Sequence, residues 1–245
     1  MNPEFIRPDW PLTDIINVAT TTRIGGASLA PYDQLNLAAH VGDDSGHVKN
    51  NRQLVASALN LPAQPKWLQQ VHGHHAVNAG LINSGRPEAD ASFTIDSDVV
   101  CAVMTADCLP VVLSDSRGQC IGVAHAGWKG LLDQVLQNTI LQMSAYTRPE
   151  YAWFGPAISP EAFEVGADVY QAFVAQSKQF QHAFEKKNDS KWNLDLYQAA
   201  KIILESAGIM HIYGGQHCTY QDEERFYSYR RDGVTGRMAT LVWKA

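Results

Sequence analysis

Hydrophobic positions along this chain follow two periods, one typical of strands and one typical of helices. Segment 16–23, INVATTTR, is β-branched and alternating, and it ends at a Gly-Gly turn. Segments 98–115 and 119–127 are apolar with few interruptions, which predicts two buried strands joined by a polar turn. A shorter strand is predicted over 66–73, KWLQQVHG. We also expect a strand at 151–157, YAWFGPA.

Helical spacing of apolar residues separates these strands. It predicts helices over 47–60 and 128–146, with further helices near 166–176 and 194–207. The C-terminal segment 226–245 is interpreted as a pair of strands. The alternation predicts a mixed α/β or α+β fold of layered sheets with flanking helices. No linker interrupts it, so we expect one domain over residues 1–245.

Composition narrows the classes of function. The 245 residues are 45% hydrophobic and 18% charged, with a formal net charge of −6, as in an ordinary globular protein. A mildly acidic chain offers no broad basic surface, which argues against nucleic acid and anionic membranes as partners. We also expect no membrane span and no secretory signal. Four cysteines without a CxxC pair favour a reduced cytoplasm. No obligate protein partner is evident.

Three reactive side chains stand at predicted strand ends: His72, Cys108 and His125. One cysteine and two histidines are a usual three-ligand set for zinc, with a fourth position left for water or substrate. Their wide separation along the chain makes spacing alone weak support, and a lone strand cysteine is more often a core residue. His74 and His75 are interpreted as exposed loop residues.

Several motifs together give the chain a family resemblance. They are TTRIGG, LNLAAHVGDD, QQVHG, ADASFT, TADCLPV, AHAGWKG, GPAISPEAFEVG and YSYRRDGVTGRMA, which run in order from about residue 16 to the C-terminus. In this combination the chain resembles the YfiH-type laccase-domain family, also called the polyphenol oxidase family. That family is associated with purine nucleoside phosphorylase activity and, in a bacterial branch, with editing of peptidoglycan precursors.

The resemblance implies a fold, a cofactor and an activity. The implied fold is a layered sandwich with a remote likeness to cysteine-hydrolase toxins. The implied zinc ligands are His72, Cys108 and His125, which would also be the catalytic residues. The implied substrates are phosphate and a purine nucleoside: adenosine, inosine, guanosine or methylthioadenosine. Deamination of adenosine is implied as a side activity.

Phosphorolysis needs a cationic site for phosphate, and we expect it among Arg23, Lys129 and Arg231. Lys129 follows His125 in the first turn of a predicted helix, where free backbone N–H groups favour an anion. Arg230 and Arg231 would point to opposite faces of a strand, so only one could face the pocket, and Arg231 is preferred.

Deamination needs a metal-activated hydroxide and a carboxylate that relays protons. Asp107, Glu164 and Asp90 are all candidates for that carboxylate, and the sequence does not choose between them. Trp128 could stack on a purine, although a tryptophan that opens an amphipathic helix is more often part of the core.

Three alternatives remain open. The first is a metal-independent hydrolase or amidase with Cys108 as nucleophile and His125 as base. The second is a non-catalytic binding protein in cell-wall quality control. The third is a copper-dependent polyphenol oxidase; a multicopper site needs about ten clustered His or Cys ligands, whereas the chain has nine histidines in all. Copper in the single His-Cys-His site is still compatible with the sequence, because copper outcompetes zinc at most nitrogen and sulfur sites.

Overall fold

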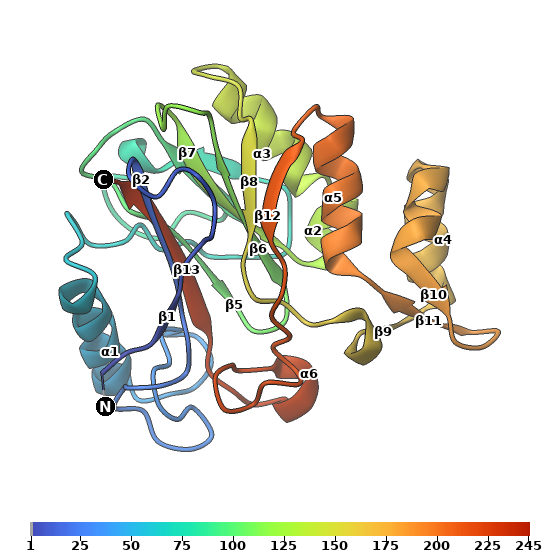
Figure 1. The fold of residues 1–245 in the computed structure, drawn as a ribbon. Helices are drawn as coiled ribbons and strands as arrows, with labels where there is room; N and C mark the ends of the chain where they lie inside the picture. The colour runs from blue at the N-terminus through green and yellow to red at the C-terminus, as the bar shows by residue number, and fades with distance from the viewer. Residues whose placement is uncertain (1) are drawn as a thin grey trace.

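The computed structural model describes residues 2–245, which form three β-sheets and six α-helices (Figure 1). The six-stranded sheet has the order β12 (His211–Gly214), β8 (Tyr151–Phe154), β6 (Leu109–Ser114), β7 (Ile121–Ala126), β4 (Ala91–Thr94) and β3 (Ala76–Asn78). The four-stranded sheet has the order β1 (Phe5–Ile6), β2 (Ile16–Thr21), β13 (Met238–Lys244) and β5 (Cys101–Thr105). The three-stranded sheet has the order β10 (Phe184–Lys186), β11 (Lys191–Leu194) and β9 (Glu164–Gly166). The helices are α1 (Ser45–Ala58), α2 (Trp128–Leu132), α3 (Val135–Ser144), α4 (Ala167–Gln176), α5 (Leu196–Ser206) and α6 (Tyr229–Asp232).

Alternation along the strands produces the layers. Val103 of β5 packs in the apolar cluster between the two larger sheets, whereas its neighbour Met104 packs with the residues that face α1. Val112 of β6 lies in the same cluster between the sheets, and Leu113 turns toward the side covered by α3 and α5. Successive strand residues point to opposite faces, so both larger sheets are buried on two sides. The predicted mixed α+β layered fold is confirmed.

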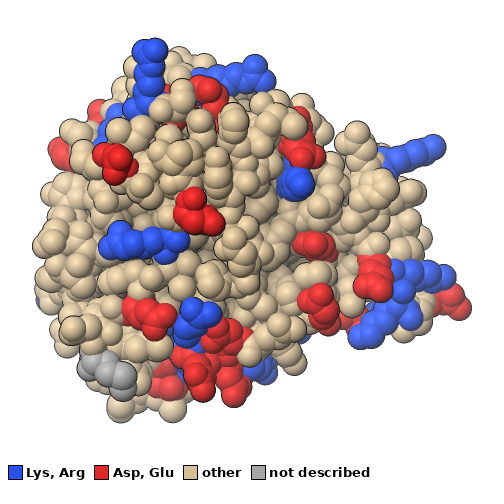
Figure 2. Space-filling view, viewed as in Figure 1, with Lys and Arg blue, Asp and Glu red and all other residues tan. Residues whose placement is uncertain are grey.

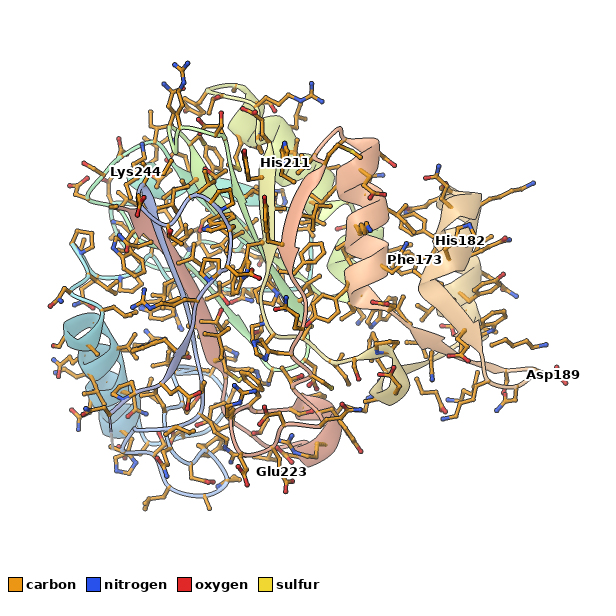
Figure 3. All side chains as sticks on the ribbon, in the orientation of Figure 1. Phe173, His182, Asp189, His211, Glu223 and Lys244 are labelled. Carbon is orange, nitrogen blue, oxygen red and sulfur yellow. The ribbon has the colours of Figure 1, made fainter. Side chains whose placement is uncertain are left out.

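The smallest sheet and α4 project beside α5. Figure 1 shows this part at the edge of the layered body, and Figure 3 places Asp189 at the far tip of the β10–β11 hairpin. Phe173 of α4 is fully buried and belongs to the same apolar cluster as the residues beneath α5. The side of the projection that faces α5 is therefore packed against the main body through shared apolar residues.

Several predicted elements differ from the structure. Segment 66–73 is not a strand: Lys66 and Gln69 form only isolated bridges. The predicted strand 98–115 is two strands in different sheets, because the chain turns at Asp107 with φ +91°. The predicted helix 128–146 is interrupted by Gln134 in the left-handed conformation.

The C-terminal strand pair is also a wrong prediction. Only β13 is a strand, and Arg230 and Arg231 lie in the helical turn α6. The strand argument for choosing between these two arginines therefore fails, because residues in a helical turn do not alternate between two faces.

The visible surface mixes charges of both signs. Figure 2 shows acidic and basic residues interspersed on this face, without a continuous basic area. No helix among residues 2–245 combines the length and the apolar character required to cross a lipid bilayer.

Candidate metal centre and its pocket

The structure brings His72, Cys108 and His125 together. One possible ligand atom from each lies within 4.8 Å of the others. Cys108 Sγ is 3.9 Å from His72 Nε2, and the two imidazole rings meet edge to face with centroids 4.7 Å apart. His125 comes from β7, Cys108 from the turn between β5 and β6, and His72 from a loop. The arrangement could hold a metal ion through two imidazoles and a thiolate.

Asp90 positions two of these three residues, His72 and His125, by accepting hydrogen bonds from both. Its carboxylate is fully buried and accepts hydrogen bonds from the backbone N–H groups of Val71, His72 and Gly73 at 2.8–3.1 Å. It also receives His125 Nδ1 at 2.7 Å. Because Nδ1 carries the proton in that bond, Nε2 of His125 is left for the cluster. Asp90 thus fixes both the loop of one ligand and the ring of another.

The third ligand depends on a strained turn. Asp107 has φ +91°, a conformation that non-glycine residues rarely adopt, and it immediately precedes Cys108. Its carboxylate accepts hydrogen bonds from Thr219 Oγ1 and from the backbone N–H of Arg230, both at 2.7 Å. These bonds hold the turn in place. Each oxygen of Asp107, one of the three candidate proton relays, therefore already accepts one hydrogen bond.

Charge stabilises the thiolate of Cys108. Burial alone would raise the pKa of this thiol, but the charge of His125 and hydrogen bonds from His125 and His72 outweigh burial and lower it to about 6. Burial would lower the pKa of His125, but Cys108 and Asp90 outweigh it and raise it to about 9. Without a metal, the two side chains form a thiolate–imidazolium pair.

The cluster lies in a pocket of about 510 Å³. Its wall is mainly apolar and aromatic, and includes Trp128, Ile158, Phe163 and Tyr229. A volume of this size falls within the range of small-molecule sites, which is roughly 300–1,000 Å³. Sequence reasoning missed further polar residues that line it: His40, Gln70 and Arg237. No local motif marks them, because they reach the pocket from three separate segments.

The structure does not bring the three predicted phosphate-binding cations to this pocket. Arg23 pairs with Asp33 at 3.2 Å and lines a different hollow. Arg231 lines that second hollow as well, and its guanidinium donates to the carbonyls of Thr219, Tyr220 and Phe226. Lys129 is exposed on α2 and lies outside the pocket lining. Arg230 lines the pocket instead of Arg231.

His74, His75 and Glu164 lie outside the cluster. His74 hydrogen-bonds Asp133 at 2.7 Å and His75 is exposed, and neither belongs to the three-residue cluster. Glu164, a second candidate relay, forms ion pairs with Lys187 and Lys191 at the protein surface.

The fold and the site together define a class: a layered α+β protein whose pocket carries a His-Cys-His cluster suited to a metal ion. A family model described as multi-copper polyphenol oxidoreductase laccase matches residues 17–245. The chain belongs to this family, as its motifs predict.

Relatives support the same assignment over the full length. Purine nucleoside phosphorylase YfiH of Escherichia coli is 45% identical over 240 residues, which is 98% of each chain. A purine nucleoside phosphorylase of Haemophilus influenzae is also 45% identical, over 98% of this chain and 99% of its own. A Neisseria meningitidis crystal structure matches with a TM-score of 0.93 at 46% identity, over 98% of both chains. YlmD from Geobacillus stearothermophilus matches with a TM-score of 0.90 at 29% identity, over 98% of this chain and 96% of its own.

Gly127→Ala is expected to disable the cluster without straining the backbone. Gly127 has φ −69° and ψ 164°, which any residue tolerates, but an added Cβ would lie 2.7 Å from Cys108 Sγ. The sulfur must move, so metal affinity should fall by at least about tenfold. Competition with a chromophoric chelator measures it. Gly73→Ala is the control, since its Cβ would meet nothing closer than 3.6 Å; an equal loss there would contradict the steric explanation.

Asp90→Asn should weaken metal binding about 10- to 100-fold, because an amide cannot orient both ligands as the carboxylate does. The free energy of unfolding should also fall by roughly 1–3 kcal/mol, since buried N–H donors lose their acceptor. Urea unfolding and chelator competition measure the two effects. Asp115→Asn is a matched control: Asp115 is buried and accepts from the N–H groups of Arg117 and Cys120. Asp115→Asn should lower the free energy of unfolding and leave metal affinity unchanged. Equal metal affinities in the two variants would refute the role of Asp90 in orienting the ligands.

The thiol of metal-free protein should react with iodoacetamide at low pH. The thiolate is the nucleophile, so a pKa lowered to about 6 keeps Cys108 reactive until the pH falls below that value. Peptide mass spectrometry from pH 5 to 9 should show half-maximal alkylation near pH 6 rather than near 8.5. His125→Gln should raise the midpoint, because His125 supplies the largest stabilising charge. A midpoint that does not move would exclude the ion pair.

Proposed function

We propose that the protein is a zinc-dependent purine nucleoside phosphorylase. Its substrates would be adenosine, inosine, guanosine and methylthioadenosine, which it would convert with phosphate into free base and ribose 1-phosphate or methylthioribose 1-phosphate. The observation that carries the proposal is the convergence of His72, Cys108 and His125 in one apolar pocket of ligand size. The names of the Escherichia coli and Haemophilus influenzae relatives support the reaction class.

The donor set fits zinc. Two imidazole nitrogens and one thiolate sulfur are ligands that zinc prefers, and three protein ligands leave one position open. The lowered pKa of Cys108 supports this, because a thiol must be deprotonated to bind a metal. Among residues 2–245 a single group of three or more metal-binding side chains is present, which does not fit several coppers held together. Copper remains an alternative occupant of the same three ligands.

The protein's own residues would bind and orient the reactants. Asp90 keeps His125 in one tautomer, and the aromatic wall formed by Phe163 and Tyr229 would pack against the purine and exclude water. A phosphate oxygen would bond to C1′ of the ribose as the bond from C1′ to N9 breaks. The electron pair of the broken bond stays on the base, which takes up the proton that hydrogen phosphate gives up. A zinc ion held in the cluster would supply a Lewis acid at this end of the pocket.

Two further parts of the proposal concern side activity and location. Adenosine deamination is proposed at the same three ligands, and of the three candidate relay carboxylates Asp107 is the one that lines the pocket, whereas Asp90 is fully buried. A cytoplasmic location is proposed because all four cysteines are free thiols.

A second candidate is favoured by the thiolate–imidazolium pair. A Cys108 pKa of about 6 and a His125 pKa of about 9 suit a cysteine nucleophile with a histidine beside it. The protein would then be a metal-independent hydrolase or amidase, with peptidoglycan precursors as possible substrates. Zinc bound in stoichiometric amount, together with activity lost on chelation, would exclude this candidate.

Inosine and phosphate should yield hypoxanthine and ribose 1-phosphate when incubated with the zinc-loaded protein. Cys108→Ala should lower kcat/KM by more than the roughly 10- to 100-fold that the loss of an outer-shell partner costs, because a ligand itself is removed. Chromatography of the products and metal analysis of the same sample test both points. Cys218→Ala is the control, since Cys218 lies outside the pocket lining. Absence of product with every purine nucleoside, or full activity in Cys108→Ala, would refute the proposal.

A further inference from the structure

Arg237 is fixed in the pocket by its own neighbours. Its backbone N–H donates to Asn36 Oδ1 at 3.0 Å. Its Nη1 donates to the carbonyls of Thr235 and Gly236 at 2.8 and 2.9 Å, and the guanidinium carbon lies 5.7 Å from the Tyr229 ring centroid. One edge of the guanidinium is therefore anchored, and the group is held in one orientation before any ligand arrives.

The other edge of the guanidinium is free. Within residues 2–245, neither Nε nor Nη2 of Arg237 has a hydrogen-bond partner, and no carboxylate oxygen lies within 4.0 Å of it. Asp107 also lines the pocket, but its oxygens already accept bonds from Thr219 and Arg230. Burial lowers the pKa of Arg237, and the charges of Cys108 and Asp107 oppose that shift without a hydrogen bond to the guanidinium. A half-buried guanidinium whose Nε–Nη2 edge makes no hydrogen bond favours an anionic ligand there.

His40 lines the same pocket beside other cations. Burial lowers the pKa of its imidazole, and the charges of Arg237, Arg86 and Arg52 lower it further. A neutral imidazole still offers one N–H donor to an anion. Arg52 is held by the carbonyl of Leu37, and among the described residues neither Arg52 nor Arg86 is in an ion pair. The three arginines place positive charge near His40, and positive charge attracts anions.

We propose that Arg237 and His40 form the subsite for inorganic phosphate in this pocket; the assignment rests on the proposed phosphorolysis. Nε and Nη2 lie along one edge of the guanidinium and suit two oxygens of a phosphate dianion. The anchored Nη1 leaves that edge available without a change of rotamer. This places the phosphate subsite at a residue that the sequence did not single out, rather than at Lys129.

Steady-state kinetics of Arg237→Gln separates phosphate binding from nucleoside binding. The variant should raise KM for phosphate by about 10- to 150-fold, since it loses charge-assisted hydrogen bonds. KM for inosine should stay within about threefold, and zinc content should stay stoichiometric. His40→Ala should raise KM for phosphate less. Arg117→Gln, at an exposed arginine outside the pocket, is the matched control.

Two further measurements distinguish folding from binding. Phosphate-independent deamination of adenosine reports whether Arg237→Gln keeps the rest of the pocket intact. Titration of the protein with inorganic phosphate alone, followed by ³¹P NMR, reports the subsite without any reaction. Phosphate should bind to the wild type and at least about tenfold more weakly to Arg237→Gln.

The outcomes separate this proposal from the proposed function. Wild-type phosphorolysis with an unchanged KM for phosphate in Arg237→Gln overturns the subsite and leaves the phosphorylase standing. A raised KM in Lys129→Gln alone overturns it as well. Arg237-dependent binding of phosphate without phosphorolysis supports the subsite and refutes the proposed function. If inosine 5′-monophosphate binds through Arg237 and inorganic phosphate does not bind, the arginine recognises a nucleotide and the assignment to free phosphate is wrong.

Discussion

The candidate site depends on one buried carboxylate. Asp90 accepts three backbone N–H groups from the Val71–Gly73 turn and one from the His125 ring. A turn that holds His72 at φ +62° has no strand partner of its own, so its donors need this acceptor. The carboxylate in turn needs its donors, because a buried charge without partners is costly. Asp90 therefore sets both the position of His72 and the tautomer of His125.

The third ligand is set by the crossing of the chain between two sheets. At Asp107 the chain leaves β5 in one sheet and enters β6 in the other, and Cys108 stands at the start of the new strand. The carboxylate of Asp107 also binds the first turn of α6 through the N–H of Arg230. Gly127 faces the sulfur and leaves no space for a side chain there. One strained residue thus joins the metal end of the pocket to its arginine-bearing wall.

The sequence predicted the three residues of the cluster better than the residues that hold them in place. Motifs identified His72, Cys108 and His125, and alternation predicted the layered fold. The apolar pattern is continuous through Asp107, so it could not show that the chain changes sheets: periodicity reports burial, not sheet membership. Asp90 was one of three candidate carboxylates, since hydrogen bonds to a distant turn leave no local pattern. Arg237 was missed because an unpaired guanidinium edge exists only in three dimensions.

The pocket contains a thiolate and a guanidinium, and the two groups have different hydrogen-bond partners. The thiolate of Cys108 faces two imidazoles, which stabilise it until a metal takes their place as its partner. Burial lowers the pKa of Arg237 and the charge of Cys108 opposes that shift, but among the described residues no hydrogen bond joins the guanidinium to the sulfur. Once a metal binds the thiolate, Asp107 still acts on the arginine through its charge, while each of its oxygens accepts a hydrogen bond from Thr219 or from the N–H of Arg230. The positive charge at that end is then available to an anion from solution.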